Sequence, residues 1–229
     1  MALAARYGSD RKATAGIEFA LIAPVAVVIL MMFYDITMVV IRRWQVVTAA
    51  DAIARVATTM AATPSGTNSL ADTQATIAST AIFGAMPFLL KQSAAGYGVA
   101  MTSVVMSPTQ AGCTSNCTYT GSVAWSLVLQ GTAVTRRLCG TQGRIADGQA
   151  PTSTALPADA FTSAPVLVVD VVYNYVPLVT TLFGPGTATG LRLAESVYVG
   201  TRTGNDAAWV RLTGTSAAAV AAHCPGYTG

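Results

Sequence analysis

A nearly continuous apolar run from Ile17 to Ile41 constrains this chain more than any other feature of its sequence. The run has about 25 residues and a helix rises about 1.5 Å per residue, so it can cross the hydrocarbon of a bilayer with some tilt. A cleaved secretory signal would have a shorter apolar stretch of about 7 to 15 residues, and a small-residue cleavage site where this chain has Arg42 and Arg43. The sequence therefore predicts a transmembrane helix.

Two carboxylates stand inside this run, Glu18 near its start and Asp35 near its end. An ionised carboxylate within hydrocarbon costs roughly 2.5 to 3.5 kcal/mol on insertion scales, so each must lie near an interface, become neutral or have a partner. For Asp35 we expect an interfacial position in which the side chain reaches water. Glu18 differs, because its flanking sequence has a pattern of its own.

The pattern around Glu18 is a basic step, a run of small residues, a Glu-Phe pair and an apolar continuation: Arg11-Lys12, Ala13 to Gly16, Glu18-Phe19, and Ala20-Leu21-Ile22-Ala23-Pro24. It resembles the processing and assembly signal of type IV-like pilins, and in particular that of the TadE-like minor pseudopilins of tight-adherence (Flp) pilus systems. The resemblance implies that a membrane prepilin peptidase removes a short cytoplasmic leader. In the family, the glutamate then becomes the fifth residue of the mature protein.

Carried onto this chain, the resemblance implies a cut between Ala13 and Thr14, with Glu18 and Phe19 in the assembly signal of the mature protein. The family prefers Gly just before the cut, so this chain departs from the pattern at Ala13. The Gly nearby is Gly16, and cleavage after it would make Glu18 the second residue. The choice of bond stays open between these two.

The likeness continues just beyond the apolar run. The stretch from Trp44 to Arg55 looks like the Ala-rich, Asp-containing helix that follows the span in TadE-like proteins. Its apolar residues recur at three- and four-residue spacing, while Asp51 and Arg55 form an i, i+4 pair on another face. We therefore expect one long helix from about Gly16 to Ala62, ending before Thr63-Pro64.

Beyond the long helix the sequence predicts an α+β head, with a mainly antiparallel four-stranded sheet packed on helices. A helix is expected over Ala71–Gln92, and Gly140–Pro165 is expected to be an exposed excursion because it is rich in Gly, Ala, Pro, Thr and Ser. The last two strands resemble the family's C-terminal strands and flank a turn at Gly184-Pro185-Gly186. The four expected strands are Val99–Met106, Tyr119–Leu129, Val166–Tyr175 and Leu191–Thr201. The expected domains are a leader at 1–13, a transmembrane and stalk helix at 14–62 and a head at 63–229.

The charges that flank the apolar run do not fix its orientation, because basic residues stand on both sides of it: Arg6, Arg11 and Lys12 before, Arg42 and Arg43 after. The cysteines give a direction, since all four follow the run and an even number is consistent with disulfides in an oxidising compartment. We expect a single-pass inner membrane protein with a cytoplasmic N-terminus. Its head would be periplasmic, and extracellular once in a pilus.

Four cysteines allow three pairings. The four-residue offset between Cys113 and Cys117 suits a turn closed by a local disulfide, which leaves Cys139 to pair with Cys224. This pairing is preferred, and the spacing alone leaves the other two open.

Catalytic chemistry finds little support in the sequence. His223 is the one histidine, and no second His or tight acidic cluster completes a metal site around it. We interpret it as a tail residue beside a disulfide cysteine, and Arg136-Arg137 as solvated loop residues. The net charge of +3, with scattered Lys and Arg, does not favour nucleic acid. We expect no catalytic, cofactor or metal site, no enzymatic activity and no nucleic-acid partner.

The resemblance implies a minor pseudopilin that takes part in assembly, priming or capping of a tight-adherence pilus involved in surface attachment. Its partners would be the prepilin peptidase, other pilin and pseudopilin subunits, the inner-membrane assembly platform and membrane lipid. The alternative is an unprocessed, membrane-anchored periplasmic domain that binds or hydrolyses a ligand. That alternative requires a pocket in the head where polar groups converge.

Overall fold

The computed structural model describes residues 2–62, 68–146, 149, 152–183, 190–200 and 209–227, with side chains from Gly16 onward except those of Thr180 and Phe183. The expected turn at Gly184-Pro185-Gly186 lies outside the described residues, as does the Thr63-Pro64 step. The chain forms two compact units. One is Met1–Ile41 with Val176–Leu191, and the other is Arg42–Tyr175 with Arg192–Gly229.

Helix α1 spans Ala2–Ala61 and begins earlier than the expected Gly16. Its part from Gly16 onward is long and apolar enough to cross a membrane. In the second unit one stripe of this helix is buried, and most of the stripe is alanine, so the helix can approach its neighbours closely: Val46, Ala49, Ala50, Ile53, Ala54, Ala57 and Ala61. The expected i, i+4 pair is also confirmed, because Arg55 Nε lies 2.8 Å from Asp51 Oδ2.

The head is built on a six-stranded sheet with the order β5-β4-β3-β2-β6-β7. Strand β2 pairs antiparallel with β3 and β6, β3 pairs antiparallel with β4, and β4 and β5 are parallel. The expected α+β head with a mainly antiparallel sheet is therefore confirmed. The strand bounds are Tyr97–Pro108 for β2, Tyr119–Gly131 for β3, Gly140–Ile145 for β4, Ala155–Pro157 for β5, Val166–Tyr175 for β6 and Leu191–Gly200 for β7.

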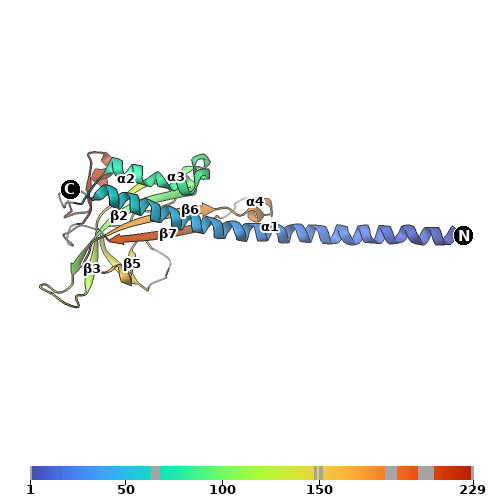
Figure 1. Ribbon diagram of the computed structural model, residues 1–229, viewed down its shortest axis with the longest axis horizontal. Coiled ribbons are helices and arrows are strands. Elements are labelled where there is room, and N and C mark those ends of the chain that lie inside the picture. Colours follow the sequence, from blue (N-terminus) through green and yellow to red (C-terminus); the bar gives the residue numbers. More distant parts are fainter. Residues whose placement is uncertain are drawn as a thin grey trace. The chain divides into compact units, whose positions relative to one another are not determined.

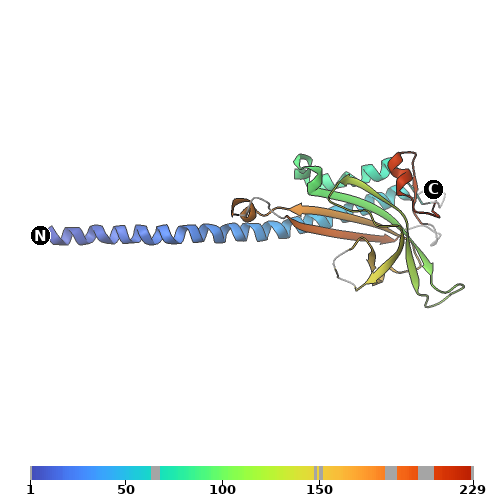
Figure 2. The same cartoon turned by 180° about the vertical axis from the view of Figure 1, so that it is seen from behind.

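Helices cover one face of this sheet, as the opposite views in Figure 1 and Figure 2 show. They are the end of α1, α2 (Asp72–Ser79) and α3 (Ala81–Ala85), followed by the 3-10 helices η1 (Pro87–Lys91) and η2 (Ala94–Gly96). A short parallel pair joins β1 (Ser69–Ala71) to β8 (Arg211–Thr213), and α5 (Ala217–Ala222) follows it. Trp125 of β3 is fully buried, and its indole Nε1 donates to Val210 O at 2.7 Å.

Three expectations about the head are wrong in detail. The main sheet has six strands and not the expected four, because β4 and β5 extend it. Gly140–Pro165 is not simply an exposed excursion, because it contains β4, β5 and the 3-10 helix η3 (Ala158–Ala160), and Leu156 is fully buried. The single helix expected over Ala71–Gln92 is divided into α2, α3 and η1. Pro87 begins η1, where its missing N–H is tolerated in a first turn but could not continue a helix ladder.

The preferred disulfide pairing is confirmed. Cys113 and Cys117 are joined with a Cα–Cα distance of 5.8 Å, and Cys139 and Cys224 with one of 5.5 Å. The first bridge closes a local turn between β2 and β3. The second connects the segment before β4 with the segment after α5, across a sequence separation of 85.

We expect the two bridges to differ in their contribution to stability. In the chain-entropy model, the Cys139–Cys224 bridge stabilises the fold by about 4.5 kcal/mol and the local bridge by about 2 kcal/mol. The Cys139→Ser/Cys224→Ser variant should therefore unfold at a lower urea concentration than the Cys113→Ser/Cys117→Ser variant in detergent-solubilised protein. As a control, the denatured, unreduced parent should take up no alkylating reagent. Labelling of all four thiols would contradict both the pairing and the oxidising location of the head.

Candidate functional site

The residues of the expected assembly signal, Glu18 and Phe19, lie on an exposed stretch of α1. Phe19 is 73% exposed and Ile17 is 63% exposed, and Glu18 is exposed between them. No hydrogen bond or ion pair joins Glu18 to another side chain in the described part of the chain. A carboxylate and an aromatic ring are thus presented together at the start of an apolar helical surface. Such a surface is suited to lipid or to the helices of other subunits.

The expected processing site precedes this surface. Ala13 and Thr14 belong to α1, but their side chains lie outside the described ones, as do those of Arg11 and Lys12. The choice between cleavage after Ala13 and after Gly16 therefore stays a prediction.

Asp35 does not have the position that its sequence suggested. It is only 8% exposed, and its carboxylate accepts hydrogen bonds from the backbone N–H groups of Leu178 at 2.8 Å and Val179 at 2.9 Å. These residues begin helix α4 (Leu178–Phe183), between β6 and β7. The expectation that this carboxylate reaches water is therefore wrong, whereas its expected place near a membrane interface stays a prediction. Asp35 satisfies donors that the first turn of a helix leaves free.

The head contains a buried polar network that the sequence did not predict. Arg137 is 1% exposed rather than solvated, and its guanidinium binds Asp170 of β6 in a bidentate pair, with N–O distances of 2.9 and 2.8 Å. Arg137 also donates to Ala155 O at 3.0 Å and to Gln142 Oε1 at 3.3 Å. Ser196 of β7 donates to the same carboxylate. The network joins β4, β5, β6 and β7 through one cation.

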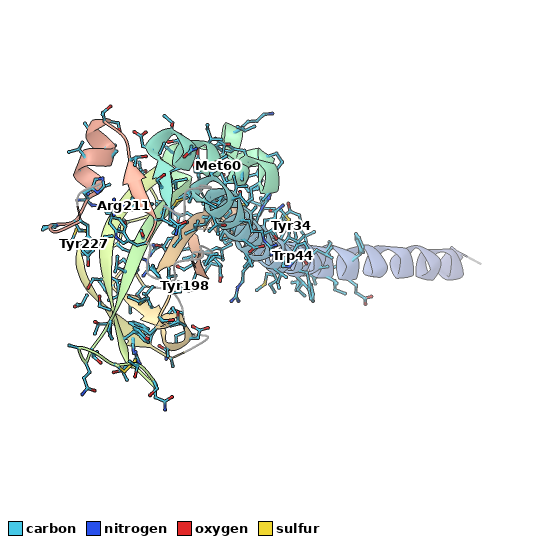
Figure 3. All side chains as sticks on the ribbon, turned by 60° about the vertical axis from the view of Figure 1, so that its left-hand side comes forward. Tyr34, Trp44, Met60, Tyr198, Arg211 and Tyr227 are labelled. Carbon is cyan, nitrogen blue, oxygen red and sulfur yellow. A yellow bond between two sulfur atoms is a disulfide. The ribbon has the colours of Figure 1, made fainter. Side chains whose placement is uncertain are left out.

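The charges in this network stabilise each other. Burial alone would lower the pKa of Arg137, but the hydrogen bond to Asp170 and its negative charge raise that pKa above its ordinary value. Tyr198, which Figure 3 labels on β7, has its ring centre 6.0 Å from the guanidinium carbon. Burial raises the pKa of this phenol, although the positive charge of Arg137 opposes the effect.

A cavity of about 270 Å³ opens beside the network. It is lined by polar and charged groups together with aliphatic ones: Val134, Thr135, Thr152, Ser153, Asp170, Val172, Arg192, Ala194, Glu195 and Ser196. Its most buried acid, Asp170, is already bound to Arg137 and Ser196, so it is not free to act as a general base. Burial raises the pKa of Glu195, and the positive charge of Arg43 acts in the opposite direction.

The described residues contain no assembled site for a metal ion or for thiol–imidazole chemistry. Within them, no group of three or more His, Cys, Asp or Glu side chains could hold a metal ion. His223 Nδ1 lies 3.0 Å from Tyr227 O, and the neighbouring Cys224 is in a disulfide. Arg136 is engaged as well, since its Nη1 donates to Ala221 O at 3.0 Å.

One local signal pointed to the network. Asp170 interrupts the strand Val166-Leu167-Val168-Val169-Asp170-Val171-Val172, and a charge within a buried strand needs a partner. Nothing local pointed to Arg137 as that partner, because the two residues are 33 positions apart. The comparison with known proteins adds no assignment: no family model matches the chain, and no curated protein or solved structure does.

Proposed function

We propose that this protein is a TadE-like minor pseudopilin, which a prepilin peptidase processes and which takes part in assembly, priming or capping of a tight-adherence pilus. One observation carries the proposal. The basic-small-Glu-Phe pattern stands at the start of an apolar helix, and there Glu18 and Phe19 are exposed side by side. The resemblance of this pattern to the pilin signal supplies the functional meaning.

The mechanism follows from the charges of this segment. Arg11 and Lys12 belong to the leader that faces the cytoplasmic peptidase, and hydrolysis of the Ala13–Thr14 peptide bond creates a new amine on Thr14. When the apolar helices of several subunits pack together, Glu18 of one subunit pairs with the Thr14 amine of its neighbour. Water is excluded from such a bundle, so an unpaired charge would be costly there and the pair selects the correct register.

The partners and location follow from the same mechanism. The prepilin peptidase, the inner-membrane assembly platform and membrane lipid act on the inserted precursor, and other pilin and pseudopilin subunits receive the processed helix. The head is periplasmic before assembly and extracellular in the pilus, with a cytoplasmic N-terminus in the precursor. The two disulfides support an oxidising environment for the head.

The alternative, an unprocessed membrane-anchored domain that binds or hydrolyses a ligand, has one observation in its favour. The cavity beside Asp170 is of moderate size, and Arg192 and Glu195 are among the groups that line it. The most buried polar groups at this cavity are occupied by each other, which favours a structural role for them. Retention of the leader in native membranes would support this alternative.

We expect the mature N-terminus to be Thr14, with Glu18 as its fifth residue. Mass spectrometry of the protein from native membranes, compared with a strain that lacks the peptidase, measures this directly. An Ala13→Leu variant should accumulate as precursor, because the peptidase accepts small residues before the cut. A mature N-terminus at Ile17 would move the cleaved bond to Gly16–Ile17 and leave the rest of the mechanism unchanged. An intact Met1 or Ala2 in the peptidase-containing strain would contradict the mechanism.

A further inference from the structure

Helix α4 is attached to α1 by a long-range polar contact. The carboxylate oxygens of Asp35 each accept one hydrogen bond from the start of α4, and the residues joined are 143 and 144 positions apart in the sequence. Both residue segments belong to the first unit. Figure 1 and Figure 2 accordingly show α4 beside α1 in opposite views. Two hydrogen bonds therefore fix the start of α4 to α1.

The described side chains on α4 and just before it are mostly apolar and carry no charge. The segment Val176-Pro177-Leu178-Val179-Thr180-Thr181-Leu182-Phe183 contains no ionisable side chain. Val176, Leu178 and Leu182 are 43, 40 and 56% exposed. The hydroxyl of Thr181 donates to Leu178 O at 2.7 Å, so its polarity is satisfied within the helix. This surface presents side chains that gain free energy when they leave water.

The apolar surface of α4 is continuous with the one that would face lipid on α1. Leu178 and four residues of α1, Val27, Leu30, Met31 and Tyr34, line a shared groove of about 260 Å³. Figure 3 labels Tyr34 on this part of α1. Leu30 and Tyr34 are themselves exposed. Lipid or protein that covers α1 between Val27 and Tyr34 therefore also contacts α4.

The depth of this groove follows from helix geometry. The hydrocarbon of a bilayer takes about 20 helical residues, and a count from Ile17 ends at about Ile36. For a span that begins at Ile17, Asp35 and the start of α4 would lie at the far boundary of the hydrocarbon. A carboxylate at that depth needs donors, and backbone N–H groups at that depth need acceptors. The hydrogen bonds from Leu178 and Val179 to Asp35 meet both needs.

We propose that α4 is a membrane-interfacial segment, whose apolar side chains lie among the acyl chains of the leaflet next to the head, and that Asp35 holds it there. This inference rests on the membrane span of the proposed function, and it requires neither leader cleavage nor pilus assembly. Lipid is the occupant because the groove is continuous with the spanning surface of α1, and because α4 offers it no charge.

The test places an environment-sensitive NBD fluorophore on α4 of the full chain, in liposomes of phosphatidylcholine and phosphatidylglycerol. A Leu182→Cys variant is labelled without reduction, so that the native disulfides stay closed. Val220→Cys on α5, which is likewise an exposed aliphatic position on a short helix, serves as the control. We expect NBD at position 182 to emit at shorter wavelength and to be quenched by lipids with a doxyl group near the headgroup. NBD at position 220 should show neither effect.

Loss of the Asp35 carboxylate should then release α4. In an Asp35→Ala background, quenching at position 182 should fall toward the value at position 220, whereas Asp51→Ala on the same helix should leave it unchanged. Flotation of every variant with the liposomes reports the membrane span separately. Water-like, unquenched emission at position 182 in protein that floats would overturn the proposal. Protection at position 182 that appears only when other pilus subunits are added would assign the surface to a protein partner and overturn it as well. Failure to float would overturn the span on which it rests.

Discussion

Replacement of Asp170 by Asn is expected to destabilise the head by about 3 to 5 kcal/mol, because it leaves the guanidinium of Arg137 buried without a counter-charge. The side chain of Arg137 is fully covered and that of Asp170 is 13% exposed, so the guanidinium itself is not in contact with bulk solvent. The substitution should also weaken the other hydrogen bonds of Arg137. Arg137 holds Gln142 and the Ala155 carbonyl, which anchor β4 and β5 to the rest of the sheet.

Urea unfolding of the detergent-solubilised full chain, followed by tryptophan fluorescence, measures this effect. Trp125 is a suitable reporter because it is fully buried in β3. Asp51→Asn is the matched control, since it removes one carboxylate from the exposed pair with Arg55 and should cost less than about 1 kcal/mol. The double variant Arg137→Met/Asp170→Leu should lose less unfolding free energy than the sum of the losses in Arg137→Met and Asp170→Leu, because it leaves no buried charge unpaired. If Asp170→Asn unfolds as the parent does, the network is not a stabilising one.

The elements that the sequence predicted are those defined by local pattern. Three- and four-residue spacing predicted one apolar stripe of α1, and five of its seven residues are buried while Val56 and Met60 are half-buried: Val46, Ala49, Ala50, Ile53, Val56, Ala57 and Met60. The run around Asp170 predicted β6, and the spacing of the cysteines favoured the observed pairing. In each case the signal lies in residues that are close in sequence, where helix and strand periodicity are visible.

The features that were missed depend on residues far apart in sequence. Strands β4 and β5 lie in a segment whose composition suggests a loop, and the main sign of burial there is Leu156. Arg137 belongs to an arginine pair that looks solvated in the sequence. Its partner Asp170 is close to it only in the folded sheet. Asp35 looks exposed to water in the sequence, because its partner in α4 lies 143 positions later. Local pattern does not encode such contacts, because the partner is specified only by the tertiary fold.

Glu18→Ala is expected to leave the protein in the membrane fraction and to remove it from assembled pili. The helix loses a carboxylate that is costly in hydrocarbon, so insertion should be equal or better. Assembly should fail, because the Thr14 amine of the neighbouring subunit then has no anion to pair with in a weakly screened bundle. Glu18→Gln should be nearly as harmful, since it keeps the shape and loses the charge.

Asp35→Ala is the comparison within the same helix. Its effect on assembly should be milder, because the Asp35 carboxylate is already bound to the backbone of its own chain at Leu178 and Val179.

The role of Glu18 in assembly is measured by the ratio of this protein in sheared pili to that in membranes, with quantitative immunoblots of the parent, Glu18→Ala, Glu18→Gln and Asp35→Ala. We expect an unchanged membrane amount for all four, a pilus signal near zero for both Glu18 variants, and substantial incorporation of Asp35→Ala. A Glu18→Ala protein that enters pili as the parent does would show that Glu18 is merely an interfacial residue, and would contradict the pseudopilin mechanism.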